Sequence, residues 1–147
     1  KKKLVYDDDL QAIAREEMED IGGGAYLLDY LHVATGTKTV PTATVRLKKG
    51  DQVIQDAACG DGPVDASLKT IDRITGLQGK LLDYAIQAVT VGTDALGEVC
   101  VRVAFGRDIV SAKAANTDIV QASAIAYLSC VNRCLLARCL AKPAKSG

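Results

Sequence analysis

The cysteines and the single histidine are the first candidates for catalysis or metal binding in this chain of 147 residues. Five cysteines are scattered along it, and Cys130 and Cys134 would share one face of a helix. No histidine accompanies that pair and its neighbours are alanine, leucine and valine, so we predict buried reduced thiols rather than a disulfide framework or a metal site. His32 lies alone in an apolar, strand-like stretch, which favours a core or half-buried position over catalysis.

The clearest binding chemistry lies in the glycine-rich turn formed by Gly60, Asp61, Gly62 and Pro63. A helix is predicted to begin there, because proline suits a first turn and apolar residues then recur at helical spacing up to residue 76. Backbone N–H groups at such a start can receive a carboxylate, and small residues permit close approach. Three acids near predicted helix starts are candidate partners for an ammonium group, although a plain helix cap is an equally good interpretation of each: Asp61, Asp65 and Asp118.

These residues belong to a pattern that occurs twice. Residues 45–67 align without a gap with residues 101–123, and the motif Leu-Leu-Asp-Tyr occurs at residues 27–30 and again at 81–84. The Gly-Thr pairs at 36–37 and 92–93 keep the offset of the main block, so the second copy has two extra residues after its Leu-Leu-Asp-Tyr motif. One supersecondary unit is therefore used twice.

Each copy predicts three strands followed by one helix. In the first copy the strands are residues 26–34, 42–47 and 52–58, and Asp61 or a neighbour is expected to cap the helix. In the second they are residues 82–90, 98–105 and 107–114, and the helix covers residues 119–140. That second helix is apolar on nearly every face and should be covered on several sides. We expect an α+β fold of two pseudo-symmetric βββα units, each a three-stranded sheet with one helix.

The chain divides into an arm, a duplicated domain and a tail. Residues 7–19 predict a short amphipathic helix within an arm of residues 1–24. The domain covers residues 25–140, with its repeats at 25–79 and 80–140, and residues 141–147 form the tail. The abrupt start without methionine is typical of a piece cut from a longer chain.

Composition disfavours several classes of partner. Eighteen basic residues balance eighteen acidic ones, which gives little support to nucleic-acid or membrane-surface binding. No uncharged apolar stretch approaches twenty residues and no signal-peptide pattern is present, so a cytoplasmic protein is expected. One helix covers only one face of a three-stranded sheet, so the units must pack on each other or on a partner chain, and we predict a homodimer.

Four ordered motifs identify a family. They are the run from Pro41 to Leu47, the run from Gly60 to Ala66, the run from Asp94 to Val99, and Thr117-Asp118-Ile119 followed by Ala122-Ser123. Together they resemble the C-terminal regulatory domain of 2-isopropylmalate synthase, which is shared with citramalate synthase, over residues 3–136. The resemblance implies two βββα units, a dimer, and binding of the pathway's end-product amino acid as a feedback inhibitor. That effector would be leucine, or isoleucine in a citramalate synthase.

The resemblance also implies where catalysis takes place. The parent enzymes condense acetyl-CoA with a 2-oxo acid in a separate N-terminal TIM barrel, which uses a divalent metal held partly by an HxH pair. This chain has one histidine and too few residues for that barrel. We therefore expect no catalytic residue, no metal and no cofactor in this segment, with the metal and acetyl-CoA belonging to the catalytic barrel as its partner. The segment alone should be inactive.

By the same resemblance, the effector pocket uses the glycine turn with Val64, together with Leu81 and Tyr84 of the second Leu-Leu-Asp-Tyr motif. Ala88 and Ala95 match further pocket positions, and ordinary sheet core is the alternative for Leu81, Tyr84 and Ala88. One departure stands out, because residues 112–114 read Ala-Lys-Ala where the family usually has Gly-x-Gly. If that loop contributes to effector binding or to contact with the barrel, we expect its shape or specificity to differ here. A purely structural dimerisation module is the rival function.

Overall fold

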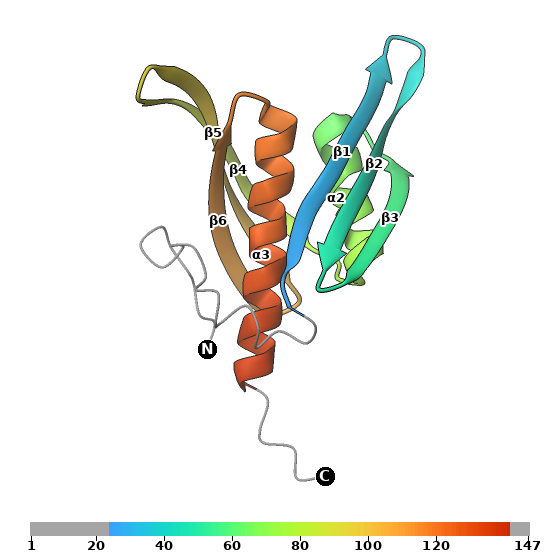
Figure 1. Ribbon diagram of the computed structural model, residues 1–147, viewed down its shortest axis with the longest axis vertical. Coiled ribbons are helices and arrows are strands. Elements are labelled where there is room, and N and C mark those ends of the chain that lie inside the picture. The colour runs from blue at the N-terminus through green and yellow to red at the C-terminus, as the bar shows by residue number, and fades with distance from the viewer. Residues whose placement is uncertain (1–23, 142–147) are drawn as a thin grey trace.

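Two βββα units follow one another along the chain in the computed structural model, which describes residues 24–141 (Figure 1). The first holds β1 (Tyr26–Gly36), β2 (Thr39–Lys49), β3 (Gln52–Cys59) and α2 (Pro63–Thr75). The second holds β4 (Lys80–Val91), β5 (Asp94–Phe105), β6 (Asp108–Asn116) and α3 (Ile119–Ala141). Each sheet is antiparallel, in the order β1-β2-β3 or β4-β5-β6. The predicted α+β class is confirmed, while the predicted helix at residues 7–19 lies outside the described residues.

The central strand of each sheet turns alternate side chains toward its helix. Ala43, Val45 and Leu47 of β2 are fully buried on the side where α2 packs. Four residues of β5 are buried in the same way under α3: Val99, Val101, Val103 and Phe105. The period of two places the apolar half of each strand on one face, so each sheet has an inner face toward the helices and an outer face.

Helix α3 is the shared core of both units. It packs on β5 and β6 of its own unit and also contacts α2 and β1 of the other, so it lies between the two sheets in Figure 1. Within the described residues it is the one helix long and apolar enough to span a membrane by composition, and 56% of that stretch is buried inside the protein. Packing against both units accounts for its composition, and the prediction that it is covered on several sides is confirmed.

The two Leu-Leu-Asp-Tyr motifs differ in register. The pairing of β1 with β2 shifts between Leu28 and Tyr30, whereas that of β4 with β5 shifts earlier in the motif, between Leu81 and Asp83. Tyr30 consequently lies opposite Arg46, and Tyr84 lies opposite the buried Val101. A shift of one residue exchanges the faces of a strand, so the two tyrosines of the repeated motif point to opposite faces of their sheets.

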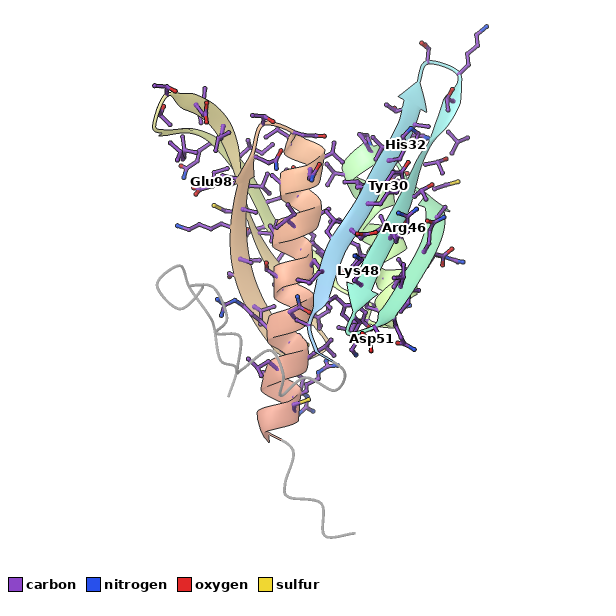
Figure 2. The ribbon with its side chains drawn as sticks, in the orientation of Figure 1. Tyr30, His32, Arg46, Lys48, Asp51 and Glu98 are labelled. Carbon is purple, nitrogen blue, oxygen red and sulfur yellow. The ribbon has the colours of Figure 1, made fainter. Side chains whose placement is uncertain are left out.

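Tyr30 and His32 lie on the outer face of the first sheet, beside Arg46 and Lys48 (Figure 2). The guanidinium carbon of Arg46 is 4.9 Å from the centre of the Tyr30 ring, a cation–π contact. The expectation of a core or half-buried His32 is wrong, because the alternation of β1 places Leu31 on the inner face and leaves His32 exposed.

Two of the five free cysteines lie on the buried side of α3, whereas Cys59 and Cys139 are exposed. Cys130 and Cys134 are fully buried. Burial raises the pKa of the Cys130 thiol to about 12 and that of the Cys134 thiol to about 11, because a thiolate would lose its hydration there. These two thiols therefore stay protonated and pack as small apolar groups.

One buried asparagine joins the two units directly. Asn132 of α3 accepts a hydrogen bond from the Tyr26 backbone N–H through Oδ1 at 2.8 Å. Its Nδ2 donates to the Tyr26 carbonyl at 2.9 Å. The side chain thus pairs with both backbone groups at the start of β1, much as a neighbouring strand would.

Replacement of Asn132 by alanine should lower the free energy of unfolding by about 2–4 kcal/mol, because two buried backbone groups of Tyr26 lose their partners. Urea denaturation of the 147-residue chain measures the loss. Ser129→Ala, one turn earlier on the same helix, is the control and should have a small effect. Equal losses in the two variants would contradict the importance of this contact.

Candidate functional site

A cavity of about 460 Å³ opens between α2, β4 and α3. It therefore lies where the helix of the first unit meets the first strand and the helix of the second. Its lining residues are Val64, Asp65, Leu68, Lys69, Asp72, Gly79, Leu81, Tyr84 and Tyr127.

The middle of this cavity has apolar walls from two elements. Val64 and Leu68 are one helical turn apart on α2. Leu81 and Tyr84 face them from the inner side of β4. Helix α3 packs over β5 and β6, so the inner side of β4 stays open and Leu81 is 39% exposed.

The glycine turn forms the start of α2 and adjoins the cavity. A β-carbon on Gly60 would lie 2.4 Å from the Ala66 backbone nitrogen, so only glycine fits there. Gly62 is the N-cap residue, and no side chain caps the first turn of the helix. Of the two expected possibilities, Asp61 is not the cap, whereas its neighbour Gly62 holds the N-cap position through its backbone alone. Asp65 instead turns back and accepts a hydrogen bond from the Asp61 N–H at 2.8 Å.

The second helix begins differently. Asp118 accepts hydrogen bonds from the backbone N–H groups of Val120 at 2.9 Å and Gln121 at 3.4 Å. It is therefore an N-terminal cap of α3, and it is not among the residues that line the cavity. The start of α2 has open backbone donors, whereas the start of α3 has its donors occupied.

Asp65 and Lys69 form an ion pair at the rim of the cavity, with Nζ and Oδ2 3.1 Å apart. The hydrogen bond from the Asp61 N–H lowers the pKa of Asp65 from its ordinary value, against the opposing effect of desolvation. Lys69 has a raised pKa because its ammonium group donates to Asp65. Both groups are charged at neutral pH.

Asp72 and Tyr127 meet at the far end of the cavity. The Tyr127 hydroxyl donates to Asp72 Oδ1 at 2.6 Å, and the Gly79 N–H donates to Oδ2 at 3.4 Å. Desolvation raises the pKa of Asp72, although the bond from Tyr127 offsets part of that effect. Desolvation also raises the pKa of Tyr127, so its hydroxyl stays a donor.

Tyr84 is fixed by a hydrogen bond to α3. Its hydroxyl lies 2.7 Å from Ser123 Oγ, and Ser123 donates its own proton to the Ile119 carbonyl at 2.8 Å. Tyr84 is therefore the donor in the first bond. This bond holds the ring as a wall of the cavity.

The structure brings together some of the predicted site residues. Val64, Asp65, Leu81 and Tyr84 line the cavity. The residues of the adjoining turn lie immediately before Val64 in the chain: Gly60, Asp61, Gly62 and Pro63. Other predicted positions are exposed in the β4–β5 hairpin outside the lining: Ala88, opposite Gly97, and Ala95, opposite Thr90.

Sequence reasoning missed five lining residues, namely Leu68, Lys69, Asp72, Gly79 and Tyr127. The four-residue spacing of Val64, Leu68 and Asp72 was a usable signal, because it places them on one face of a helix. Nothing in the sequence indicated that Tyr127 would reach Asp72, since that contact depends on how the two units pack.

The Ala-Lys-Ala departure lies within a strand rather than in a loop. Residues 112–114 belong to β6 and pair with β5 from Val101 to Val99. No residue other than glycine has a positive φ among the described residues. The description of these residues as a loop is wrong, and alanine and lysine adopt this extended backbone without strain.

The fold defines the class of protein as a duplicated βββα domain, and comparison with known proteins gives its family. The family described as the LeuA allosteric (dimerisation) domain matches residues 4–135. This chain belongs to that family, which confirms the resemblance to the regulatory domain of 2-isopropylmalate synthase.

Similar proteins are named 2-isopropylmalate synthase. The protein of Carboxydothermus hydrogenoformans is 50% identical over 92% of this chain and 26% of its own length. That of Pelotomaculum thermopropionicum is 48% identical over 90% of this chain and 26% of its length. That of Methylacidiphilum infernorum is 46% identical over 92% of this chain and 27% of its own length. The chain thus spans about a quarter of the length of these curated relatives. Within residues 24–141, no group of three or more His, Cys, Asp or Glu side chains is placed to hold a metal ion.

Replacement of Gly79 by alanine should destabilise the protein by about 1–3 kcal/mol through overpacking. A β-carbon there would lie 2.1 Å from the Tyr127 hydroxyl oxygen, and so would displace the tyrosine from Asp72. Gly36→Ala is the control, since its β-carbon would meet Thr39 Oγ1 at an ordinary 3.5 Å. Thermal unfolding of both variants tests this, and a Gly79→Ala protein as stable as wild type would contradict the close contact.

The raised pKa of Asp72 predicts a pH dependence. Folding favours the protonated form of Asp72. The contribution of this protonation to the free energy of unfolding is therefore complete below the unfolded-state pKa and is lost as the pH rises through the folded-state pKa. Asp72→Asn does not titrate there. The unfolding free energy of wild type minus that of Asp72→Asn should therefore fall as the pH rises above 3.8, the ordinary pKa of an aspartate. Urea denaturation across that range measures the difference, and a rise with pH would show that the pKa is lowered instead.

Proposed function

We propose that this chain is the leucine-binding regulatory domain of a 2-isopropylmalate synthase and that bound leucine inhibits the enzyme. Family membership supports the regulatory role, and the names of the relatives favour leucine as the end product. The cavity beside the glycine turn is the observation that carries the proposal, because it offers a separate partner for each part of a free amino acid.

The carboxylate would lie at the start of α2. No side chain occupies the first-turn donors there, and the positive end of the helix dipole attracts an anion. The ammonium group would pair with Asp65, whose described contacts with Asp61 and Lys69 both use Oδ2 and leave Oδ1 available. Asp61, exposed on the adjoining turn, is the other candidate for this pairing.

The branched side chain would lie between α2 and β4. Val64 and Leu68 supply one apolar wall, and Leu81 and Tyr84 supply the other. Because the cavity has walls from both units, an occupant favours one packing of the units over another, which is the requirement for allosteric coupling.

A homodimer is part of the same proposal. Large apolar side chains remain exposed on the inner side of β4, with Leu81 at 39% and Ile86 at 50%. A second copy packed on this strand would cover them and would close the open side of the cavity. In the whole enzyme, the domain would pass its state to the catalytic barrel.

Calorimetric titration of the chain with leucine, isoleucine and valine in parallel tests the proposal. Preferential binding of leucine is the expected result. A preference for isoleucine would move the assignment to citramalate synthase. Absence of heat from all three ligands with a folded dimer would favour a purely structural module.

Tyr84→Ala should weaken leucine binding about tenfold to a hundredfold, because one apolar wall of the cavity is lost. Tyr30→Ala is a matched control, since the same motif residue of the first unit lies on the outer face of its sheet. Circular dichroism checks the fold and calorimetry measures the affinities. Unchanged affinity in folded Tyr84→Ala would remove Tyr84 from the site.

A further inference from the structure

The lining of the cavity changes from apolar to charged along α2. Val64, Leu68 and Asp72 follow one another at four-residue spacing on its face of the helix, so an apolar stretch ends in a carboxylate. The α-helical rise from residue 64 to residue 72 adds up to about 12 Å. A small ligand anchored at the helix start would therefore extend its side chain over Leu68 and toward Asp72.

Asp72 lies at the boundary between two hollows. A second hollow of about 710 Å³ begins on its other side and shares only Lys69, Asp72 and Gly79 with the first cavity. The hydrogen bond from the Gly79 N–H to Asp72 thus lies between the two hollows, and the bond from Tyr127 fixes the carboxylate from the side of α3.

Among the side chains that the structure describes, the carboxylate of Asp72 has no charged partner. No lysine or arginine in residues 24–139 forms an ion pair with it, and its described partners are a hydroxyl and a backbone N–H. Its remaining lone pairs therefore depend on water, which both hollows can supply, and the lone pairs on the cavity side depend on water in the cavity. An apolar group pressed against this carboxylate would remove that water without offering a hydrogen bond in return.

We propose that Asp72, held in place by Tyr127 and Gly79, sets the maximum side-chain length of the amino acid that this cavity accepts. This inference rests on the proposed function, since it assumes a ligand anchored at the start of α2. A four-carbon branched side chain lies over Leu68 and stops short of Asp72. A longer unbranched chain reaches the carboxylate and dehydrates it.

An unbranched series of ligands tests the length limit by calorimetry with the 147-residue chain. The probes are norvaline, norleucine and 2-aminoheptanoate, each longer by one methylene, with leucine as the reference. Wild type should lose at least about fivefold in affinity from norleucine to 2-aminoheptanoate, because the last methylene dehydrates Asp72.

The variant Asp72→Leu/Tyr127→Phe makes the far end apolar without leaving an unpaired hydroxyl. In this variant the loss should disappear, and affinity should instead rise about fourfold for each added methylene. Tyr127→Phe alone is the matched control. It removes a hydrogen bond and keeps the carboxylate, so it should retain the wild-type loss.

Each outcome decides between the proposals. If the loss persists in folded Asp72→Leu/Tyr127→Phe, the length limit is wrong while leucine binding stands. If wild type binds none of the four ligands, the proposed function fails and the length limit fails with it. Should circular dichroism show the double variant unfolded, Asp72→Asn takes its place, and a loss as large as that of wild type would overturn the inference.

Discussion

The burial of one apolar helix between two sheets is the constraint on which the rest of this structure depends. Helix α3 has no polar face of its own, so both units must cover it. Its residues also make the specific contacts between the units, since Asn132 pairs with the backbone of Tyr26 and Tyr127 donates to Asp72. The cavity lies between the units because this helix fixes their relative position.

Duplication has produced two similar hollows with different chemistry. The counterpart of the cavity is a hollow of about 450 Å³ formed by β1 and α3, with Leu28 and Ile125 among its lining. Asp118 occupies the donors at the start of that helix, and Asn132 is already bonded to Tyr26. The shifted register also turns Tyr30 away, so the hollow beside β1 lacks the open donors and the motif tyrosine that the hollow beside α2 keeps.

The sequence was sufficient for the parts of the fold that depend on local pattern. Periodicity and the repeat predicted all six strands, both described helices and their order, because alternation and helical spacing are local properties. The sequence was not sufficient to predict that Tyr30 and Tyr84 point to opposite faces. That difference arises because the register shift falls one residue earlier in the second of two identical motifs. The role of Asp72 and the exposure of His32 likewise depend on packing across the whole domain.

The central claim is that leucine occupies one cavity, between α2 and β4. Amide chemical shifts of the ¹⁵N-labelled chain, recorded by NMR during titration with leucine, test it most directly. The account predicts the largest changes at Gly62, Val64, Asp65, Leu81 and Tyr84, with saturation at one leucine per chain. Largest changes around Leu28 and Ile125, in the hollow beside β1, would contradict it, as would a spectrum that leucine leaves unchanged.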